Sequence, residues 1–185
     1  MSSFNLSNEP FTLSRDCNAV MVPHGDAVCL PVGQIGYITQ ALGGSFTVYV
    51  DGNLFRIAGG DADALDKEPP AAIEVAADAT NADVEKLAWD QLRTVFDPEI
   101  PVNVVDLGLV YDLRLEQTAP DERKVYVTLT LTAPGCGMGD TLVDDARTKL
   151  KLIPTVTEAD VDLVFDPQWS HSMMSDAAKL ETGML

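Results

Sequence analysis

The sequence predicts an α+β protein in two parts, a small β-rich module followed by a two-layer α-β-β-α-β sandwich. The N-terminal third consists mainly of β-branched and aromatic runs separated by turn residues, which is typical of short antiparallel strands. From Asn81 onward the apolar residues recur at helical spacing and then in alternation, in the order helix, strand, strand, helix, strand. We therefore expect the module at residues 1–68, a linker at 69–81 and the sandwich at 82–185.

The clearest signal in the module is a β-hairpin. Residues 45–50 are β-branched and aromatic, residues 51–53 are Asp-Gly-Asn, and an apolar run resumes at 54–57. The glycine accepts the positive φ angle that a tight hairpin turn requires. Shorter strands are predicted at 28–32 and 35–40. In the linker, a proline pair followed by alanines favours an extended chain.

Two helices are predicted in the sandwich. Asn81 is placed to cap the first helix, and Asp97-Pro98 marks its end. The second helix, at residues 138–152, has aspartates near its start and basic residues near its end, as the helix dipole favours. The apolar residues of the first helix lie three or four positions apart and form one stripe: Val84, Leu87, Ala88, Leu92, Val95 and Phe96.

Three strands complete the sandwich. The first two are separated by a polar turn and should pair as an antiparallel hairpin. A helix joins the second strand to the third, so these two should run parallel with a right-handed crossover. The residues expected on one face are Leu109, Tyr111, Leu113 and Leu115 in the first strand, Val125, Val127, Leu129 and Leu131 in the second, and Val161, Leu163 and Phe165 in the third.

This chain order places three loops at one edge of the sheet. The parallel strands end there and the first strand begins there, so the loops 97–106, 133–139 and 166–171 should converge. The third loop and the residues after it contribute Trp169, Met173 and Met174, whose large apolar groups we interpret as closing the core. His171 is either a ligand or a surface residue.

Cys136 is the principal candidate functional residue. It lies between Gly135 and Gly137 in the segment Ala-Pro-Gly-Cys-Gly-Met-Gly, directly before the second helix. Glycines keep the backbone around the sulfur accessible, and a helix N-terminus favours the thiolate, which is the form that binds iron. The alternative is a buried structural cysteine.

The first loop contributes three acidic candidates, Asp97, Glu99 and Asp106. Each has an ordinary alternative role, because aspartate commonly serves turns and helix ends. From the residues alone, a functional role and a turn-forming role are equally good interpretations of this acidic loop.

Composition excludes several classes of partner. The chain has 185 residues and a formal net charge of −17, which repels nucleic acid and anionic membranes and leaves a basic protein surface as the reasonable partner. No apolar run reaches the ~18 residues of a membrane span, and no secretory signal is present, so we expect a cytoplasmic protein.

The three cysteines do not form a disulfide framework. Cys17, His24 and Cys29 match no zinc-site spacing.

Several long segments agree with one known family at the same time. They are residues 97–103, 106–111 and 130–139 in the C-terminal half, together with 40–48, 60–65 and 173–181. The C-terminal half resembles the metal–sulfur cluster biosynthetic domain family, which is PaaD-like, and the whole chain is similar to the SufT branch of that family. The resemblance implies iron–sulfur cluster assembly, a fold like other cluster-assembly domains, Cys136 as the functional thiol, and a supporting site made of Asp97, Glu99, Asp106, Thr132, Gly135 and Gly137. It gives His171 no role.

The number of cysteines limits the mechanism. An iron–sulfur cluster normally takes about four protein ligands, so one cysteine cannot hold it alone. We expect a transient cluster that passes through Cys136 to iron–sulfur client proteins, or ligands shared across a homodimer. The alternative is a metal-free adaptor that docks assembly proteins and clients. We expect no enzymatic turnover, because a nucleophilic cysteine would need a nearby base and only His24 and His171 are histidines.

Overall fold

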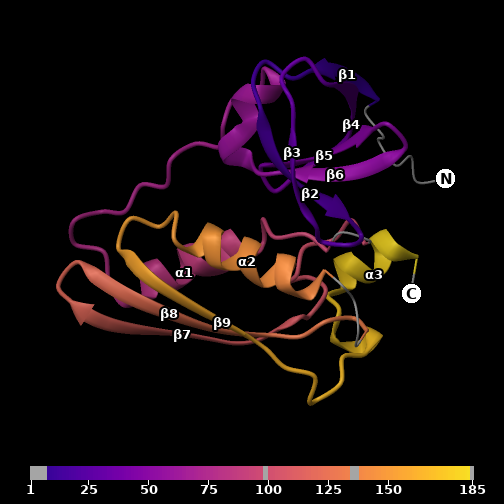
Figure 1. The fold of residues 1–185 in the computed structure, drawn as a ribbon. Helices are drawn as coiled ribbons and strands as arrows, with labels where there is room; N and C mark the ends of the chain where they lie inside the picture. The colour runs from indigo at the N-terminus through magenta and orange to yellow at the C-terminus, as the bar shows by residue number, and fades with distance from the viewer. Residues whose placement is uncertain (1–7, 98–99, 134–137, 184–185) are drawn as a thin grey trace. The chain divides into compact units, whose positions relative to one another are not determined.

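The computed structural model describes residues 8–97, 100–133 and 138–183. The chain divides into two compact units, Met1–Ala71 and Ala72–Leu185 (Figure 1). In the described part of the chain, no helix has both the length and the apolar character needed to cross a membrane.

The first unit is one antiparallel sheet followed by a short 3-10 segment. Its strands lie in the order β1, β4, β5, β6, β2, β3. The predicted hairpin is confirmed: Val50 pairs with Asn53, and the turn residues Asp51 and Gly52 have φ angles of 50° and 89°. The elements are β1 (Glu9–Thr12), β2 (Cys17–Val22), β3 (Ala27–Leu30), β4 (Ile35–Leu42), β5 (Ser45–Val50), β6 (Asn53–Ile57) and η1 (Gly59–Leu65).

One face of this sheet forms the core of the first unit. Along β5 and β6 alternate residues are buried, as expected when one face of a sheet is covered. The η1 segment contributes Ala64 and Leu65 to the same core. Each fully buried aliphatic side chain adds about 1.5–3 kcal/mol to folding. The remaining core residues include Phe11, Leu13, Ile38, Val48 and Ile57.

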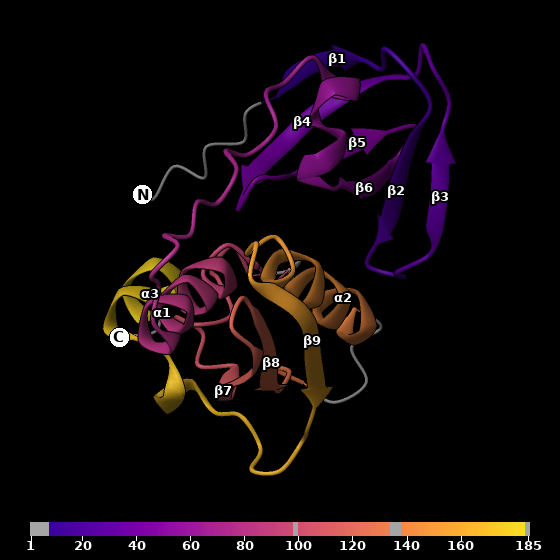
Figure 2. The same cartoon turned by 90° about the vertical axis from the view of Figure 1, so that its left-hand side faces the viewer.

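The second unit is a two-layer sandwich, which confirms the predicted α+β class. Its sheet has the order β7, β8, β9, with β7 antiparallel and β9 parallel to β8. Figures 1 and 2 show α1 and α2 lying against one face of this sheet. The elements are α1 (Asn81–Leu92), β7 (Val110–Ala119), β8 (Glu122–Leu129), α2 (Gly139–Leu150), β9 (Val156–Leu163), η2 (His171–Met173) and α3 (Asp176–Thr182).

The core of the second unit lies between the helices and the sheet. The predicted helical stripe and strand alternation are largely confirmed: Val84, Ala88 and Leu92 of α1 are buried in the same core as residues of β8 such as Val127 and Leu129. From α2 the buried apolar side chains are Leu142, Ala146 and Leu150. Ile73, Val75 and Ala79, which precede α1, also pack against this core.

The start of α1 differs from the prediction. Thr80, not Asn81, is the N-cap: its hydroxyl accepts from the Asp83 amide, and the Asp83 carboxylate accepts from Thr80 in return. The side chain of Asn81 does not cap the helix, because its oxygen accepts a hydrogen bond from Nε of the buried Arg123 at 2.9 Å. A second guanidinium nitrogen of Arg123 donates to the carbonyl of Ala79.

Three other expected boundaries are wrong. The helix α1 ends at Leu92, because the amides of Thr94 and Val95 bond to carbonyls three residues back, at Gln91 and Leu92, instead of four. The strand β8 ends at Leu129, so Thr132 lies beyond the sheet. The strand β9 also ends earlier than expected, at Leu163, and Phe165 is exposed rather than on the core face.

Candidate functional site

The described residues confirm the predicted meeting of chain ends at one edge of the second unit's sheet. Val110, at the start of β7, pairs with Leu129 at the end of β8, and Leu129 pairs with Leu163 at the end of β9. The segments that precede β7 and follow β8 and β9 therefore begin or end at this edge. We refer to it as the site edge.

The first of these segments is folded into two turns. The amide of Ile100 donates to the Asp97 carboxylate at 3.0 Å. Asn103 organises the second turn: its side-chain oxygen accepts from the amides of Val105 and Asp106, and its side-chain nitrogen donates to the Asp106 carboxylate at 2.6 Å. Asp97 and Asp106 are thus both built into turns, which is the ordinary role that their sequence positions left open.

A backbone bridge joins the bases of the two turns. Phe96 and Asn103 pair as an isolated antiparallel bridge, and the amide of Asp97 donates to the carbonyl of Val102 at 3.2 Å. The two aspartates therefore project from one small, hydrogen-bonded loop. Sequence reasoning missed Asn103, although asparagine is a common turn residue whose side chain bonds backbone groups shortly after it.

The C-terminal segment packs over this loop and holds it in place. The Trp169 indole donates to the carbonyl of Leu107 at 2.7 Å, and the amide of Ser175 donates to the carbonyl of Asp106 at 2.8 Å. Met174 is buried and Trp169 is partly buried against the core, as predicted, but Met173 is exposed. We call residues 167–175 the strap.

Gly108 lets the strap approach closely. It has a φ angle of 72°, and a side-chain carbon at this position would collide with the backbone carbonyl of Met173. The Tyr111 hydroxyl adds a bond to the carbonyl of Pro167 at 2.8 Å. His171 belongs to the strap and is exposed, with its ring 5.0 Å from that of Trp169.

The loop that contains Cys136 is described only at its two ends. Cys136, Gly135, Gly137 and Glu99 lie outside the described residues. Thr132 is half-buried where the chain leaves the sheet.

The far end of that loop is anchored at the start of α2. Met138 is the N-cap residue of α2 and is buried. Gly139 packs tightly, because an added carbon would lie 3.0 Å from the side chain of Leu131 and 3.3 Å from that of Leu163, and both would have to shift slightly. The cysteine loop thus leaves and re-enters the fold at the site edge. Within the described residues the N-cap Met138 makes no side-chain bond to the first turn of α2, and the partial positive charge of a helix N-terminus favours an anion there.

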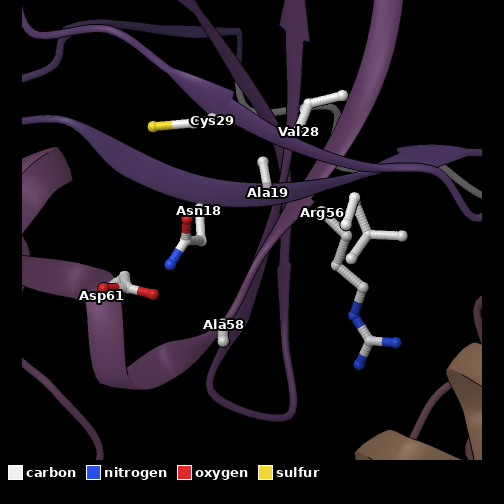
Figure 3. Close-up of a pocket in the computed structure, with 9 residues that line it drawn as sticks. Asn18, Ala19, Val28, Cys29, Arg56, Ala58 and Asp61 are labelled. Atoms are coloured by element: carbon white, nitrogen blue, oxygen red, sulfur yellow. The ribbon is translucent and has the colours of Figure 1, made fainter.

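The other two cysteines lie on neighbouring strands of the first unit. Cys17 is buried, and burial, with a smaller contribution from Asp61, raises the pKa of its thiol. Cys29 is exposed and lines an open pocket with Asn18, Ala19 and Asp61 (Figure 3). Within the described ranges no group of three or more His, Cys, Asp or Glu is arranged to hold a metal ion.

The two thiols are expected to differ strongly in reactivity. In the native protein at pH 8, iodoacetamide should modify Cys29 at least about 100-fold faster than Cys17, because burial denies access to Cys17 and lowers its thiolate fraction. Peptide fragmentation by mass spectrometry locates the label. In urea the two rates should converge, and equal rates in the native protein would contradict the burial of Cys17.

Comparison with known proteins assigns the second unit to a protein family. A family model described as iron–sulfur cluster assembly protein matches residues 71–161. An Fe-S protein maturation auxiliary factor of Porphyromonas gingivalis is 47% identical over 94 residues, which are 51% of this chain and 86% of that protein. The Fe-S protein maturation auxiliary factor SufT of Staphylococcus aureus is 39% identical over 90 residues, covering 49% of this chain and 98% of the relative.

A solved structure agrees with these matches. The crystal structure of a domain of unknown function from Bacillus anthracis has a TM-score of 0.51 and 34% identity, and the match covers 56% of this chain and 95% of that one. The chain therefore belongs to the iron–sulfur cluster assembly protein family. Its relatives within that family are maturation factors of the SufT type. The first unit lies before the matched residues and the strap lies after them.

Proposed function

We propose that this protein is a maturation factor that helps to transfer iron–sulfur clusters to client proteins, with Cys136 as the working thiol. Membership of the family and the names of the relatives support the maturation role. The observation that carries the choice of Cys136 is the site edge. Both ends of the cysteine loop are anchored there, beside the loop that carries Asp106 and at the N-terminal end of α2.

The proposed transfer is a ligand exchange without a redox step. The Cys136 thiolate binds one iron of the cluster, and a client thiolate then attacks that iron. The new iron–sulfur bond forms as the bond to Cys136 breaks, and Cys136 takes up a proton that balances the one lost by the client thiol. The amides at the start of α2 favour the Cys136 thiolate before the cluster arrives. A single sulfur releases its cargo readily, because the client provides more ligands.

The setting of this activity follows from the charge and the family. We infer that the partners are iron–sulfur assembly and client proteins in the cytoplasm, and that nucleic acid and membranes are not among them. The cluster is cargo rather than a resident cofactor. A homodimer that contributes two Cys136 thiolates to one cluster is a variant of the same mechanism. We also propose that no enzymatic turnover is involved.

A second candidate function is a metal-free adaptor that docks assembly proteins and clients. The observation in its favour is that the carboxylates of Asp97 and Asp106 accept hydrogen bonds within their own turns. Carboxylates that accept these bonds hold the loop in a fixed shape, which a protein-binding surface requires and which needs no contact with a metal cargo. Anaerobic reconstitution followed by an iron count separates the two functions, since an adaptor retains partner binding with no iron bound.

Replacement of Cys136 tests the transfer mechanism. In an anaerobic assay with a client apoprotein, Cys136→Ala is expected to slow cluster loading of the client at least about tenfold, because the only proposed ligand is lost. Cys29→Ala is the matched control, since Cys29 is an exposed thiol of the first unit and its loss should have no effect on loading. Unchanged loading by Cys136→Ala would rule out transfer through this thiol and leave the adaptor.

A further inference from the structure

The sheet of the first unit exposes a row of apolar side chains. Tyr37, Tyr49 and Leu54 pair directly across β4, β5 and β6, and they are 49%, 45% and 37% exposed. Pro10 pairs with Tyr37 at one end, and Val22 pairs with Leu54 at the other. Residues that pair directly across antiparallel strands lie on the same face, so these five residues form one continuous row. We call it the tyrosine row.

The tyrosine row is not part of the unit's own core. The residues that alternate with it, such as Ile38, Val48 and Phe55, are buried on the opposite face. The solvated face of an antiparallel sheet normally carries polar residues. Val32 and Ile35, which lead into β4, add further apolar surface and are 60% and 66% exposed. Contiguous exposed apolar groups of this kind mark an interaction site.

Carboxylates surround this end of the sheet. Asp51 lies in the turn between β5 and β6, and its carboxylate accepts from the side chain of Gln34 at 3.2 Å. Asp16 accepts from the amide of Val32 at 2.7 Å. Asp26 lies in the turn between β2 and β3, beyond the end of the row at Val22. The rim of the tyrosine row therefore carries negative charge.

Two of the three basic residues of the first unit form ion pairs with carboxylates other than Asp16, Asp26 and Asp51. Arg15 forms ion pairs with Asp61 and Asp63, and Lys67 forms one with Glu9. Arg56 shares the face of the row and donates to the hydroxyl of Ser45. The remaining acidic groups, within a chain of net charge −17, attract positive charge.

We propose that the tyrosine row is a docking surface for a partner protein whose apolar contact area is rimmed by lysine and arginine. Tyrosine is favoured at the centre of interfaces, because it buries a large area at little cost in conformational entropy and keeps a polar tip. Opposite charges at the rim speed association and select the partner. A second copy of this chain is disfavoured, because its rim would bring like charges together. The residues involved precede the part of the chain that matches the family.

The test measures binding of two defined peptides to the full chain. One short synthetic peptide alternates leucine and lysine, and its matched control alternates leucine and glutamate. By isothermal titration calorimetry the lysine peptide should bind at least about tenfold more tightly than the glutamate peptide at low salt. Raising the salt from about 50 to about 300 mM should weaken its binding, since rim charges are screened.

Variants distinguish docking at the row from general attraction to an acidic protein. The double variant Tyr37→Ser and Tyr49→Ser keeps the net charge and should weaken binding of the lysine peptide at least about tenfold. Tyr126→Ser removes a tyrosine from the sheet of the second unit and should leave the affinity unchanged, as should Cys136→Ala. Equal affinity of the double variant and the wild type would overturn the proposal. So would a dimer, detected by analytical ultracentrifugation, that the double variant abolishes, because the row would then bind a second copy.

Discussion

Replacing Gly108 with alanine is expected to destabilise the second unit by about 3 kcal/mol or more, for two reasons that add. The φ angle of 72° is costly for any residue with a side chain. In addition, the new methyl group would meet the carbonyl of Met173, which is backbone and has no alternative rotamer. Relief of this collision requires the strap to move away, which lengthens the bonds from Trp169 to Leu107 and from Ser175 to Asp106.

Gly183 provides the matched control for Gly108. Its φ angle is 71°, but no atom of the described residues lies within 4 Å of an added carbon, so Gly183→Ala should show only the conformational cost of about 1–2 kcal/mol. Urea unfolding followed by tryptophan fluorescence reports on the correct unit, because both tryptophans, Trp89 and Trp169, belong to it. If the two variants lost the same free energy of unfolding, the strap would not pack against Gly108 as described.

The parts of the fold that sequence reasoning predicted correctly depend on local patterns. The Asp51-Gly52 hairpin, the helical stripe of α1 and the alternation in β8 are each set by residues close together in the chain. The parallel pairing of β8 and β9 followed from the helix between them. The parallel pairing in turn predicted that loops distant in sequence meet at the site edge. This long-range feature therefore followed from the order of neighbouring elements in the chain.

The features that were missed depend on tertiary contacts. The strand β1 has only four residues and pairs with β4, and β2 pairs with the distant β6 as well as with its neighbour β3. Asn81 is a good helix cap by type, but Arg123, which follows it by about forty residues, takes its side chain. Phe165 continues the alternation of β9 in the sequence, yet the strand ends before it. In each case a partner distant in sequence, or the early end of a strand, overrides the local pattern.

The candidate site shows the same division. The sequence identified Asp97 and Asp106, and the structure shows what holds them: turns built on Asn103 and a strap that comes from the C-terminal residues. The bond from Trp169 to Leu107 spans sixty-two positions and has no local signal. Cys136 and Glu99 lie outside the described residues, so their roles stay predictions.

Replacing Asn103 with aspartate is expected to place two carboxylates within hydrogen-bond distance. The variant keeps the oxygen that accepts from the amides of Val105 and Asp106, but it loses the nitrogen that donates to the Asp106 carboxylate at 2.6 Å. Repulsion between two partly exposed carboxylates should cost about 1–2 kcal/mol of unfolding free energy at pH 7.5. Lowering the pH lets the pair share one proton in the native state, which therefore binds protons more readily than the unfolded chain. The loss relative to the wild type should consequently shrink as the pH falls toward about 4.5.

Asn103→Ala separates this charge effect from the loss of hydrogen bonds. Alanine removes all three bonds of the side chain without adding charge, so its cost of about 1–2 kcal/mol should be nearly the same at both pH values. Urea unfolding at pH 4.5 and 7.5 for the wild type and both variants gives the comparison. If the aspartate variant lost the same free energy at both values, Asp106 would not lie beside position 103. The Asp106 carboxylate would then be free to face a cluster or a client rather than its own turn.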